Sequence, residues 1–398
     1  MRRLAVLVLL IAGACSSPPG ASPSSTPSRQ PVAATQGVAN TPRPTGVAGA
    51  GGGSAQASPG TLPKSLAVLV DLFAAKGGYA ITLVAADGSV VARTSAQTRS
   101  AIADAVELPY VSSSNSRVYY MDGDHDIRYL KADGSSGLAT TVSGSATVHA
   151  AFAVTPDDAR IAVGLLDYSV SPVKLTIYVE DIGGAHHAVI FTSTDKYVWP
   201  VAWHSGHLVV AYLGPGAVPF KSKFVNYSGR DLAQYPYGPN PYGGINFHVI
   251  NPVTAQREVI ISGGGASGLL TKAGTAVVQG DGVDWNGQPI FWNSPTDYGS
   301  FSASGSLSPD GRIIAACCPQ PGTAGHLVLW YLGGTTTILA VNVTSVDWAG
   351  WFDSSHLITG FYQRADGTPS VVDISSDSVT VVDAHGIVAA MLPANLDS

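Results

Sequence analysis

Two adjacent cysteines, Cys317 and Cys318, are the residues of this sequence with the clearest potential for redox chemistry. Apart from Cys15, they are the only cysteines in the chain of 398 residues. Neighbouring cysteines can close a strained ring, and strained disulfides are easily reduced and often functional. Two reduced, buried thiols at a strand end are the alternative. We favour the vicinal disulfide, because the N-terminus described below predicts an oxidising compartment.

A second candidate is an aromatic insertion, residues 214–244, which interrupts the spacing of the predicted strands. Exposed tyrosines give a large contact area at low entropic cost and suit peptide or sugar surfaces. Long loops on a rigid scaffold often carry function. An equally supported alternative is that these side chains pack onto their own domain. The aromatic residues of the insertion are Phe220, Phe224, Tyr227, Tyr235, Tyr237 and Tyr242.

Three acids at alternate positions, Asp122, Asp124 and Asp126, are spaced as in a calcium-binding loop. The EF-hand pattern needs Gly at its sixth position and Glu at its twelfth, where this chain has Ile127 and Asp133. Asp and Gly residues also promote tight turns. We therefore interpret this segment as a hairpin turn and keep the three acids as a weak metal candidate.

Paired histidines do not predict a metal centre either. His204 and His207 flank a His-Ser-Gly-His turn, and no third ligand is nearby in the sequence. His186 and His187 are adjacent, and adjacent strand residues face opposite sides of a sheet. Residues 281–286, which include two Asp and one Asn, again indicate a Gly-rich turn. We therefore expect turn residues here, with no metal and no cofactor.

The N-terminus predicts an exported lipoprotein. Arg2 and Arg3 precede an apolar run at residues 4–11, and small residues then lead to Cys15. This layout is that of a secretory signal, and the run is too short to span a bilayer. It resembles the bacterial lipoprotein signal, which implies cleavage after residue 14 and acylation of Cys15. An ordinary cleaved signal peptide is the alternative.

A low-complexity tether follows the signal. Residues 16–62 contain no aromatic residue and no acid, and they are dominated by Pro, Ser, Thr, Ala and Gly. Such a composition cannot bury enough apolar surface to offset the entropy lost on ordering. A flexible coil of this length reaches about 40 Å on average. We therefore divide the chain into a signal at 1–14, the lipidated cysteine with its tether at 15–62, and one domain at 63–398.

The charge of the predicted domain argues against nucleic acid as a partner. The whole chain has 21 basic and 27 acidic residues, and four of the basic ones precede residue 63, so the domain carries 17 − 27 = −10. Phosphate backbones are bound through clustered Lys and Arg, which this domain lacks. We expect a monomer that contacts the membrane through its lipid anchor alone.

A long-range repeat predicts the fold. Residues 155–162 (Thr-Pro-Asp-Asp-Ala-Arg-Ile-Ala) return as residues 308–315 (Ser-Pro-Asp-Gly-Arg-Ile-Ile-Ala). Apolar positions after comparable turns recur at a spacing typical of four-stranded propeller blades. These positions are Val68, Val118, Ile161, Leu208, Ala276, Ile313 and Leu357.

The fold that we predict is all-β, a single β-propeller of seven four-stranded blades, with six or eight as the alternatives. Blade one lacks a first strand of its own, and residues 386–393 have an inner-strand pattern with no local partner. We therefore expect the C-terminal strand to pair into the first blade, which closes the ring and leaves only short edges.

The repeat at residues 155–162 and 308–315 resembles those of TolB-like and WD40-like bacterial propellers. The resemblance covers residues 63–398. It implies a propeller fold and, loosely, a binding or scaffolding role, and it carries over no catalytic residue.

These observations favour a non-catalytic binding or scaffolding protein, exported and lipid-anchored on the outer face of the cell membrane, or of the outer membrane in a host with two membranes. The ligand would be an envelope protein, a peptide or a glycan. The alternative is a propeller enzyme, a lyase, hydrolase or quinone-dependent oxidoreductase, with a site assembled from blade-top loops. The Gly-x-Ser-x-Gly, Gly-Lys-Ser/Thr and His-Glu-x-x-His motifs are missing, and so are the tryptophan docking motifs of quinone-dependent propellers.

Overall fold

The computed structural model describes residues 65–221, 246–261, 266–277, 282–290, 305–317, 327–339, 349–359 and 368–394, together with Leu396. All of them belong to one unit of the chain, Gly60–Ser398. Their regular structure consists of β-strands. Within these ranges, no helix has the length and apolarity that a membrane span requires.

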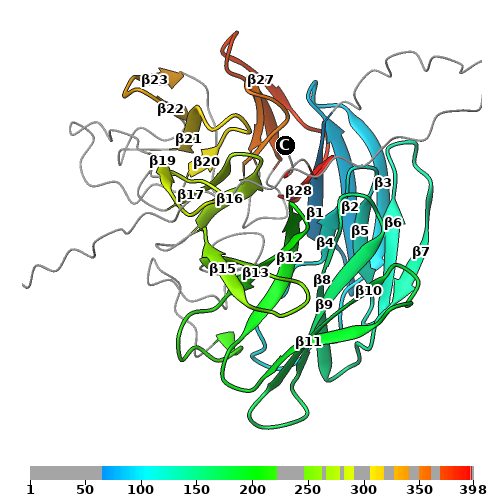
Figure 1. Cartoon of the computed structure of the whole chain (residues 1–398). Helices are drawn as coiled ribbons and strands as arrows, with labels where there is room; N and C mark the ends of the chain where they lie inside the picture. Colours follow the sequence, from blue (N-terminus) through cyan, green and yellow to red (C-terminus); the bar gives the residue numbers. More distant parts are fainter. Residues whose placement is uncertain are drawn as a thin grey trace, which may run out of the picture. The chain divides into compact units, whose positions relative to one another are not determined.

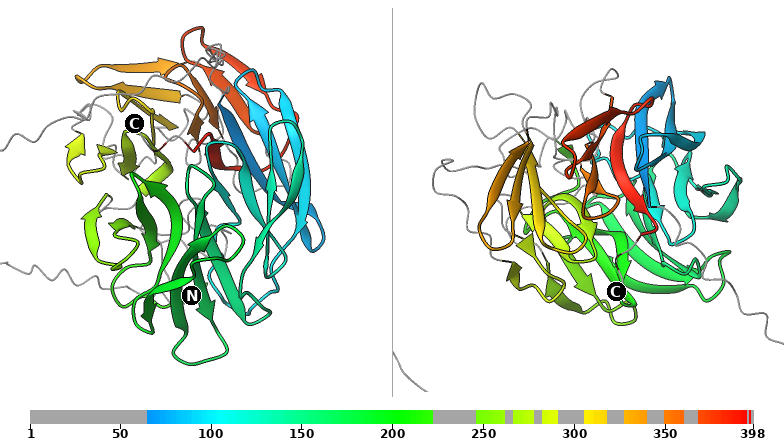
Figure 2. Two further views of the ribbon diagram at one scale, coloured as in Figure 1. Left: turned by 45° about the vertical axis from the view of Figure 1, so that its right-hand side comes forward. Right: turned by 90° about the horizontal axis from the view of Figure 1, so that it is seen from above.

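The described strands form seven antiparallel sheets of four strands each, arranged around a ring as the blades of a propeller (Figures 1 and 2). The structure thus confirms the all-β prediction, and the blade count is seven rather than six or eight. The seven predicted positions all lie in the second strand of a blade, counted from the centre of the ring.

The strands of each blade, from the inner to the outer edge, are as follows. Blade 1 contains β28 (Ile387–Leu392), β1 (Leu66–Ala75), β2 (Gly78–Ala85) and β3 (Val90–Gln97). Blade 2 contains β4 (Val111–Ser113), β5 (Val118–Asp122), β6 (Asp126–Leu130) and β7 (Ser136–Thr141). Blade 3 contains β8 (Val148–Val154), β9 (Arg160–Asp167), β10 (Lys174–Asp181) and β11 (Ala188–Ser193). Blade 4 contains β12 (Val198–His204), β13 (His207–Tyr212), β14 (Asn246–Ile250) and β15 (Arg257–Ile260).

The other three blades follow the same order. Blade 5 contains β16 (Ala266–Thr271), β17 (Gly274–Val277), β18 (Gly282–Val283) and β19 (Pro289–Ile290). Blade 6 contains β20 (Gly305–Leu307), β21 (Ile313–Cys317), β22 (Leu327–Tyr331) and β23 (Thr336–Leu339). Blade 7 contains β24 (Gly350–Trp351), β25 (His356–Thr359), β26 (Ser370–Asp373) and β27 (Ser378–Val381).

The C-terminal strand closes the ring, as the sequence predicts. In the antiparallel pairing of β28 with β1, Leu392 lies opposite Leu66 and Ile387 opposite Val70. Blade 1 is therefore built from both ends of the domain. The contact with blade 7 is equally close, because a Cβ added to Gly350 would lie 2.5 Å from Met391 Sδ. A small residue thus fits position 350, where blades 7 and 1 converge.

The two copies of the repeat form the same turn between a first and a second strand. Thr155 Oγ1 accepts a hydrogen bond from the Arg160 amide, and Ser308 Oγ accepts one from the Ile313 amide, both at 2.9 Å. Each turn also places one residue in the left-handed region, with φ of 63° at Asp158 and 71° at Gly311. A hydroxyl, a proline and an Asp or Gly thus fit this turn for physical reasons.

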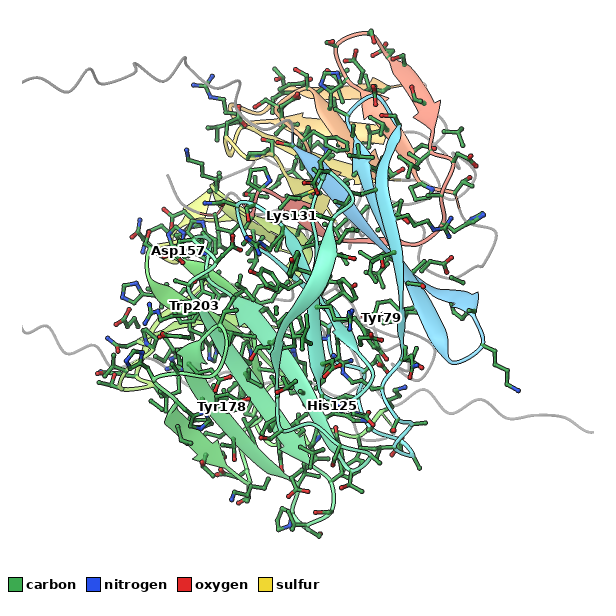
Figure 3. The ribbon with its side chains drawn as sticks, turned by 90° about the vertical axis from the view of Figure 1, so that its right-hand side faces the viewer. Tyr79, His125, Lys131, Asp157, Tyr178 and Trp203 are labelled. Carbon is green, nitrogen blue, oxygen red and sulfur yellow. The ribbon has the colours of Figure 1, made fainter. Side chains whose placement is uncertain are left out.

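Because consecutive hairpins alternate along each blade, the ring has two distinct faces. The turn face carries the hairpins between first and second strands, such as residues 155–159 and 308–312. The insertion face carries the connections between second and third strands, including the connection from Tyr212 to Asn246. Figure 3 shows Asp157 at the turn face and His125 at the insertion face.

Candidate functional site

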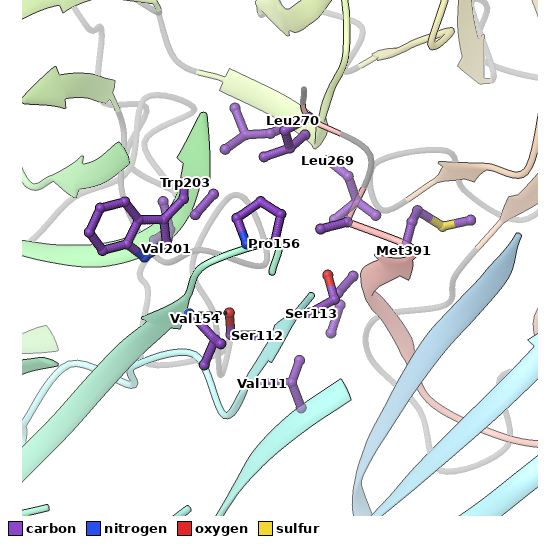
Figure 4. A pocket seen from close by; sticks show the side chains of 15 residues that line it. Val111, Ser112, Ser113, Val154, Pro156, Val201, Trp203, Leu269, Leu270 and Met391 are labelled. Carbon is purple, nitrogen blue, oxygen red and sulfur yellow. Dashed lines mark hydrogen bonds between the residues drawn. The ribbon is translucent and has the colours of Figure 1, made fainter. Parts of the chain in front are cut away.

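The central channel is narrow near the turn face. Its lining includes Val111, Val154 and Val201 from three inner strands, with Met391 from β28, and their side chains converge on a small cavity (Figure 4). The volume of this cavity is about 30 Å³. The Ser112 hydroxyl nearby accepts a hydrogen bond from the Val154 amide at 3.0 Å. This cavity therefore has room for little more than a water molecule.

Pro393, Ala394 and Leu396 form a strap across this end of the channel. The Ala394 amide donates a hydrogen bond to the Ser114 carbonyl of blade 2 at 2.8 Å. The Leu396 carbonyl accepts one from Nδ1 of His204 in blade 4 at 2.6 Å. The Leu396 side chain is only 6% exposed and packs into the core formed by blades 3 and 4. The strap thus fastens blade 1 to two other blades.

A larger cavity, of about 450 Å³, lies beside the strap between blades 5, 6 and 7. We call it the turn-face cleft. Its volume is in the range of small-ligand pockets. The strap takes part in it through Pro393 and Ala394, and the first described residue, Ser65, lies at its edge. The residues that dominate its chemistry are Leu269, Leu270, Lys272, Asp310, Trp351 and Asp353.

The floor of the turn-face cleft is apolar. Leu269, Leu270 and Trp351 are at most 5% exposed. The indole N–H of Trp351 donates to the Ser306 carbonyl at 3.4 Å, which fixes the ring against blade 6. A bound apolar group would therefore meet an already ordered surface, which reduces the entropic cost of binding.

Two carboxylates form the rim of the cleft. Asp353 accepts hydrogen bonds from the amides of Ser355 (2.7 Å) and His356 (2.8 Å). Burial alone would raise the pKa of Asp310, but hydrogen bonds from the Ser308 hydroxyl and the Arg312 amide lower it below its usual value. Asp310 is therefore ionised at neutral pH, next to an apolar floor. The exposed Lys272 adds one cation to the rim.

The described start of the insertion packs onto the ring. Phe220 lies edge-on to Tyr168 at a centroid distance of 5.7 Å and forms an isolated bridge with Ala105. The Tyr168 hydroxyl donates to the Pro219 carbonyl at 3.1 Å. For Phe220, the structure thus supports packing onto the domain rather than ligand contact. The other five aromatic residues of the insertion, Phe224, Tyr227, Tyr235, Tyr237 and Tyr242, lie outside the described residues.

A polar cluster holds the connection between blades 1 and 2, residues 98–110, on the insertion face. The Arg99 guanidinium donates to the carbonyls of Leu108 and Pro109 and lies 4.0 Å from the centre of the Tyr110 ring. His149 Nε2 donates to the Ser100 carbonyl at 2.9 Å. Burial, followed by the Arg99 charge, lowers the pKa of His149 below its usual value. These contacts fasten residues 98–110 to the ring.

The cysteines are described only in part. Cys317 ends β21, with its backbone opposite Leu327 at the insertion face. Cys15 and Cys318 lie outside the described residues. The vicinal disulfide and the lipidation of Cys15 therefore remain predictions. Cys317 and Tyr212 both end the second strand of a blade, so the chain leaves β21 and β13 at the same face of the ring.

The three alternating acids form the predicted hairpin turn between β5 and β6, in which Asp122 lies opposite Asp126. Asp122 accepts the Gln97 amide at 2.8 Å, and Asp124 accepts both the amide and the hydroxyl of Ser100 at 2.7 Å. In the part of the chain that the structure describes, no three His, Cys, Asp or Glu side chains are grouped as metal ligands would be.

His204 and His207 flank the predicted turn, between β12 and β13, and His186 and His187 lie in the connection between β10 and β11. His204 stacks on Trp285 at 4.0 Å, whereas His207 Nε2 lies 3.1 Å from a Glu258 carboxylate oxygen. His186 and His187 contact the carboxylates of Asp181 and Glu180. Asp284 accepts the amides of Asn286 and Gln288 within a turn, and Asp281 lies outside the described residues.

Sequence reasoning did not find the turn-face cleft. Asp310 was visible as the acid of the clearest repeat, and residues 349–352 as an inner strand. Nothing in the linear sequence indicates that these segments meet residues 269–272. The available signal was indirect, since the Asp of each first turn must lie on one face of the ring.

Solved structures resemble this chain in fold at low sequence identity. Dihydro-heme d1 dehydrogenase NirN in complex with DHE has a TM-score of 0.46 at 12% identity, covering 83% of this chain and 75% of that one. A protein of Bacteroides fragilis assigned as a 6-phosphogluconolactonase has a TM-score of 0.41 at 13% identity, covering 84% and 99%. A protein of Agrobacterium tumefaciens assigned as TolB has a TM-score of 0.33 at 13% identity, covering 82% and 91%.

No family model and no curated protein matches the chain. The similar structures include proteins with different activities, and at these identities and scores none of those activities carries over. The fold assignment rests on the strand pairing itself.

Proposed function

We propose that the protein is an exported, lipid-anchored binding protein that holds a peptide in the turn-face cleft. The observation that carries this proposal is a cavity of about 450 Å³ with an ordered apolar floor and two carboxylates on its rim. Apolar pockets with a few placed polar groups are typical ligand sites. The cleft opens on the turn face.

The composition of the cleft favours a peptide with an apolar side chain next to a basic one. Leu269 and Leu270 offer aliphatic contact, and the Trp351 ring is too buried to serve as an open platform for a sugar. Asp310 and Asp353 supply negative charge where a Lys or Arg would lie. The charge of −10 on the domain would also attract a basic peptide from a distance.

The state of the two carboxylates supports binding over catalysis. Asp310 and Asp353 both accept hydrogen bonds from backbone amides of their own turns. A carboxylate held in this way is fixed in position, which suits the recognition of a cation. A general acid would instead need a raised pKa, whereas the pKa of Asp310 is lowered.

The proposal is tested with short fluorescent peptides and the purified domain. We expect a Gly-spaced peptide of Leu and Lys to bind more tightly than a Leu and Glu peptide or a Ser and Lys peptide. Ser354 is exposed and lines the cleft, so Ser354→Trp should fill the cavity and weaken binding at least tenfold. Asn115→Trp, in the exposed turn of blade 2, is the matched control and should bind normally.

The charge of the rim is tested by Asp310→Asn with Asp353→Asn, because Asn keeps an oxygen for the turn amides. We expect the double variant to lose the preference for Lys over Glu. If Ser354→Trp binds like Asn115→Trp, the cleft is not the site. If Tyr235→Ala, Tyr237→Ala and Tyr242→Ala together abolish binding instead, the aromatic insertion is the site.

A further inference from the structure

A groove on the outer side of the ring, between blades 3 and 4, has a chemistry different from that of the cleft. Its volume is about 370 Å³. Ile177 and Phe191 come from the outer strands of blade 3, and Val198 and Val210 from the inner strands of blade 4. These residues give the groove an apolar wall along both blades.

Two cations line the same groove. Lys196 precedes β12, and Arg257 begins β15; both are exposed. Among the described residues, neither side chain has an ion pair or a hydrogen bond to a partner. Some arginines elsewhere in the domain have carboxylate partners, for example Arg117 with Asp158 at 3.4 Å and Arg128 with Asp122 at 3.8 Å. In a domain with an excess of acids, two cations without a carboxylate at one groove indicate a site for an anion.

His248 contributes a polar group to the wall of the groove. It is only 8% exposed, its ring lies 4.9 Å from the ring of Tyr212, and both residues line the groove. Within the described ranges, neither side chain forms a hydrogen bond. Burial, followed by the Arg257 charge, lowers the pKa of His248 to about 4, so the imidazole is neutral and has one N–H to donate. Because His248 lines the groove, a ligand oxygen there could accept a hydrogen bond from this N–H.

We propose that this groove binds a small amphipathic carboxylate. Its apolar body would lie against Ile177, Phe191 and Val198. Its carboxylate would accept hydrogen bonds from Arg257 and from the N–H of His248, and Lys196 would add attraction at the same groove. The site is independent of the peptide cleft, because the two share no residue.

Isothermal titration calorimetry with three probes of one chain length tests this site. We expect decanoate to bind, the neutral decanol to bind at least tenfold more weakly, and the cationic decylammonium not to bind. A charge-assisted hydrogen bond corresponds to roughly a tenfold change in affinity. Arg257→Gln should therefore weaken decanoate binding about tenfold, and Lys196→Gln about threefold.

Two exposed cations outside the groove supply the controls, Arg93→Gln for arginine and Lys174→Gln for lysine. Both should bind decanoate as the unaltered protein does. His248→Phe keeps an aromatic ring but removes the N–H, and it should weaken decanoate more than decanol. The proposal is overturned if decanol binds as tightly as decanoate, if no decanoate binds, or if Arg257→Gln binds like Arg93→Gln.

Discussion

At the residue scale, the protein uses a few polar side chains to fix backbone turns and leaves others directed at cavities. Asp310 illustrates the first group, since its oxygens accept from the Ser308 hydroxyl and the Arg312 amide. His248 illustrates the second group, because it lies in the groove wall with a strongly lowered pKa. The two groups respond differently to pH, and for the histidines this response can be measured as a pH-dependent change in stability.

We expect His248 to destabilise the domain as the pH falls from 6.5 to 4. Its pKa is lowered from 6.5 to about 4 by burial and then by Arg257, so the unfolded chain binds a proton in this range and the folded one does not. The domain therefore keeps its full stability with respect to His248 above pH 6.5, and its free energy of unfolding declines below that pH. His149, whose pKa is also lowered by burial, acts in the same direction.

Urea unfolding at pH 7 and pH 4.5 measures this effect. The His248→Phe variant should lose less stability between the two values than the unaltered protein, by about 1–3 kcal/mol. His385→Phe, at an exposed position, is the control and should follow the unaltered protein. An equal loss in all three proteins would show that His248 is protonated as readily in the folded state as in the unfolded one.

At the element scale, the strap explains how one end of the chain holds several blades. Ala394 bonds to blade 2 and Leu396 to blade 4, while β28 itself belongs to blade 1. His204 and Leu396 are 192 residues apart in the sequence. The strap therefore links parts of the ring that no local contact could join.

We expect Leu396→Ala to destabilise the domain by about 2–4 kcal/mol, because the substitution removes a buried side chain and leaves a cavity. The melting temperature should fall accordingly, and the amide of Ala394 should exchange hydrogen faster. Val253→Ala, at an exposed apolar position, serves as the control and should change little. If Leu396→Ala melts like Val253→Ala, the strap adds no stability to the ring.

The strands were predictable because their signals are local. A turn residue, an alternating apolar pattern and a regular spacing identified the second strand of every blade, and the unpaired pattern at residues 386–393 identified β28. The strap carries no such pattern, since residues 393–396 are too few to show a periodicity. The cleft is also non-local, because Leu270, Asp310 and Trp351 come from three blades. Sequence periodicity reports the scaffold, whereas cavities depend on which blades become neighbours.

At the scale of the whole molecule, the signal and the tether predict where the propeller works. We expect the unaltered protein to fractionate with membranes and Cys15→Ser to appear in the soluble fraction. The physical reason is that two or more acyl chains anchor a protein stably and none would remain. Ser16→Ala is the matched control and should stay in the membrane fraction. Membrane retention of Cys15→Ser would contradict the lipoprotein assignment.

The pairing of β28 with β1 also determines how the protein responds to a mechanical pull. The described chain enters the first blade at Leu66, which lies between Ala85 on one side and Leu392 on the other. If the ring holds a ligand, tension applied through the residues before Leu66 acts on β1. This strand is hydrogen-bonded to β2 on one side and to β28 on the other. Detaching that strand requires two hydrogen-bonded ladders to break together. The seam of the ring is thus the first part to receive the force and is reinforced on both sides against it.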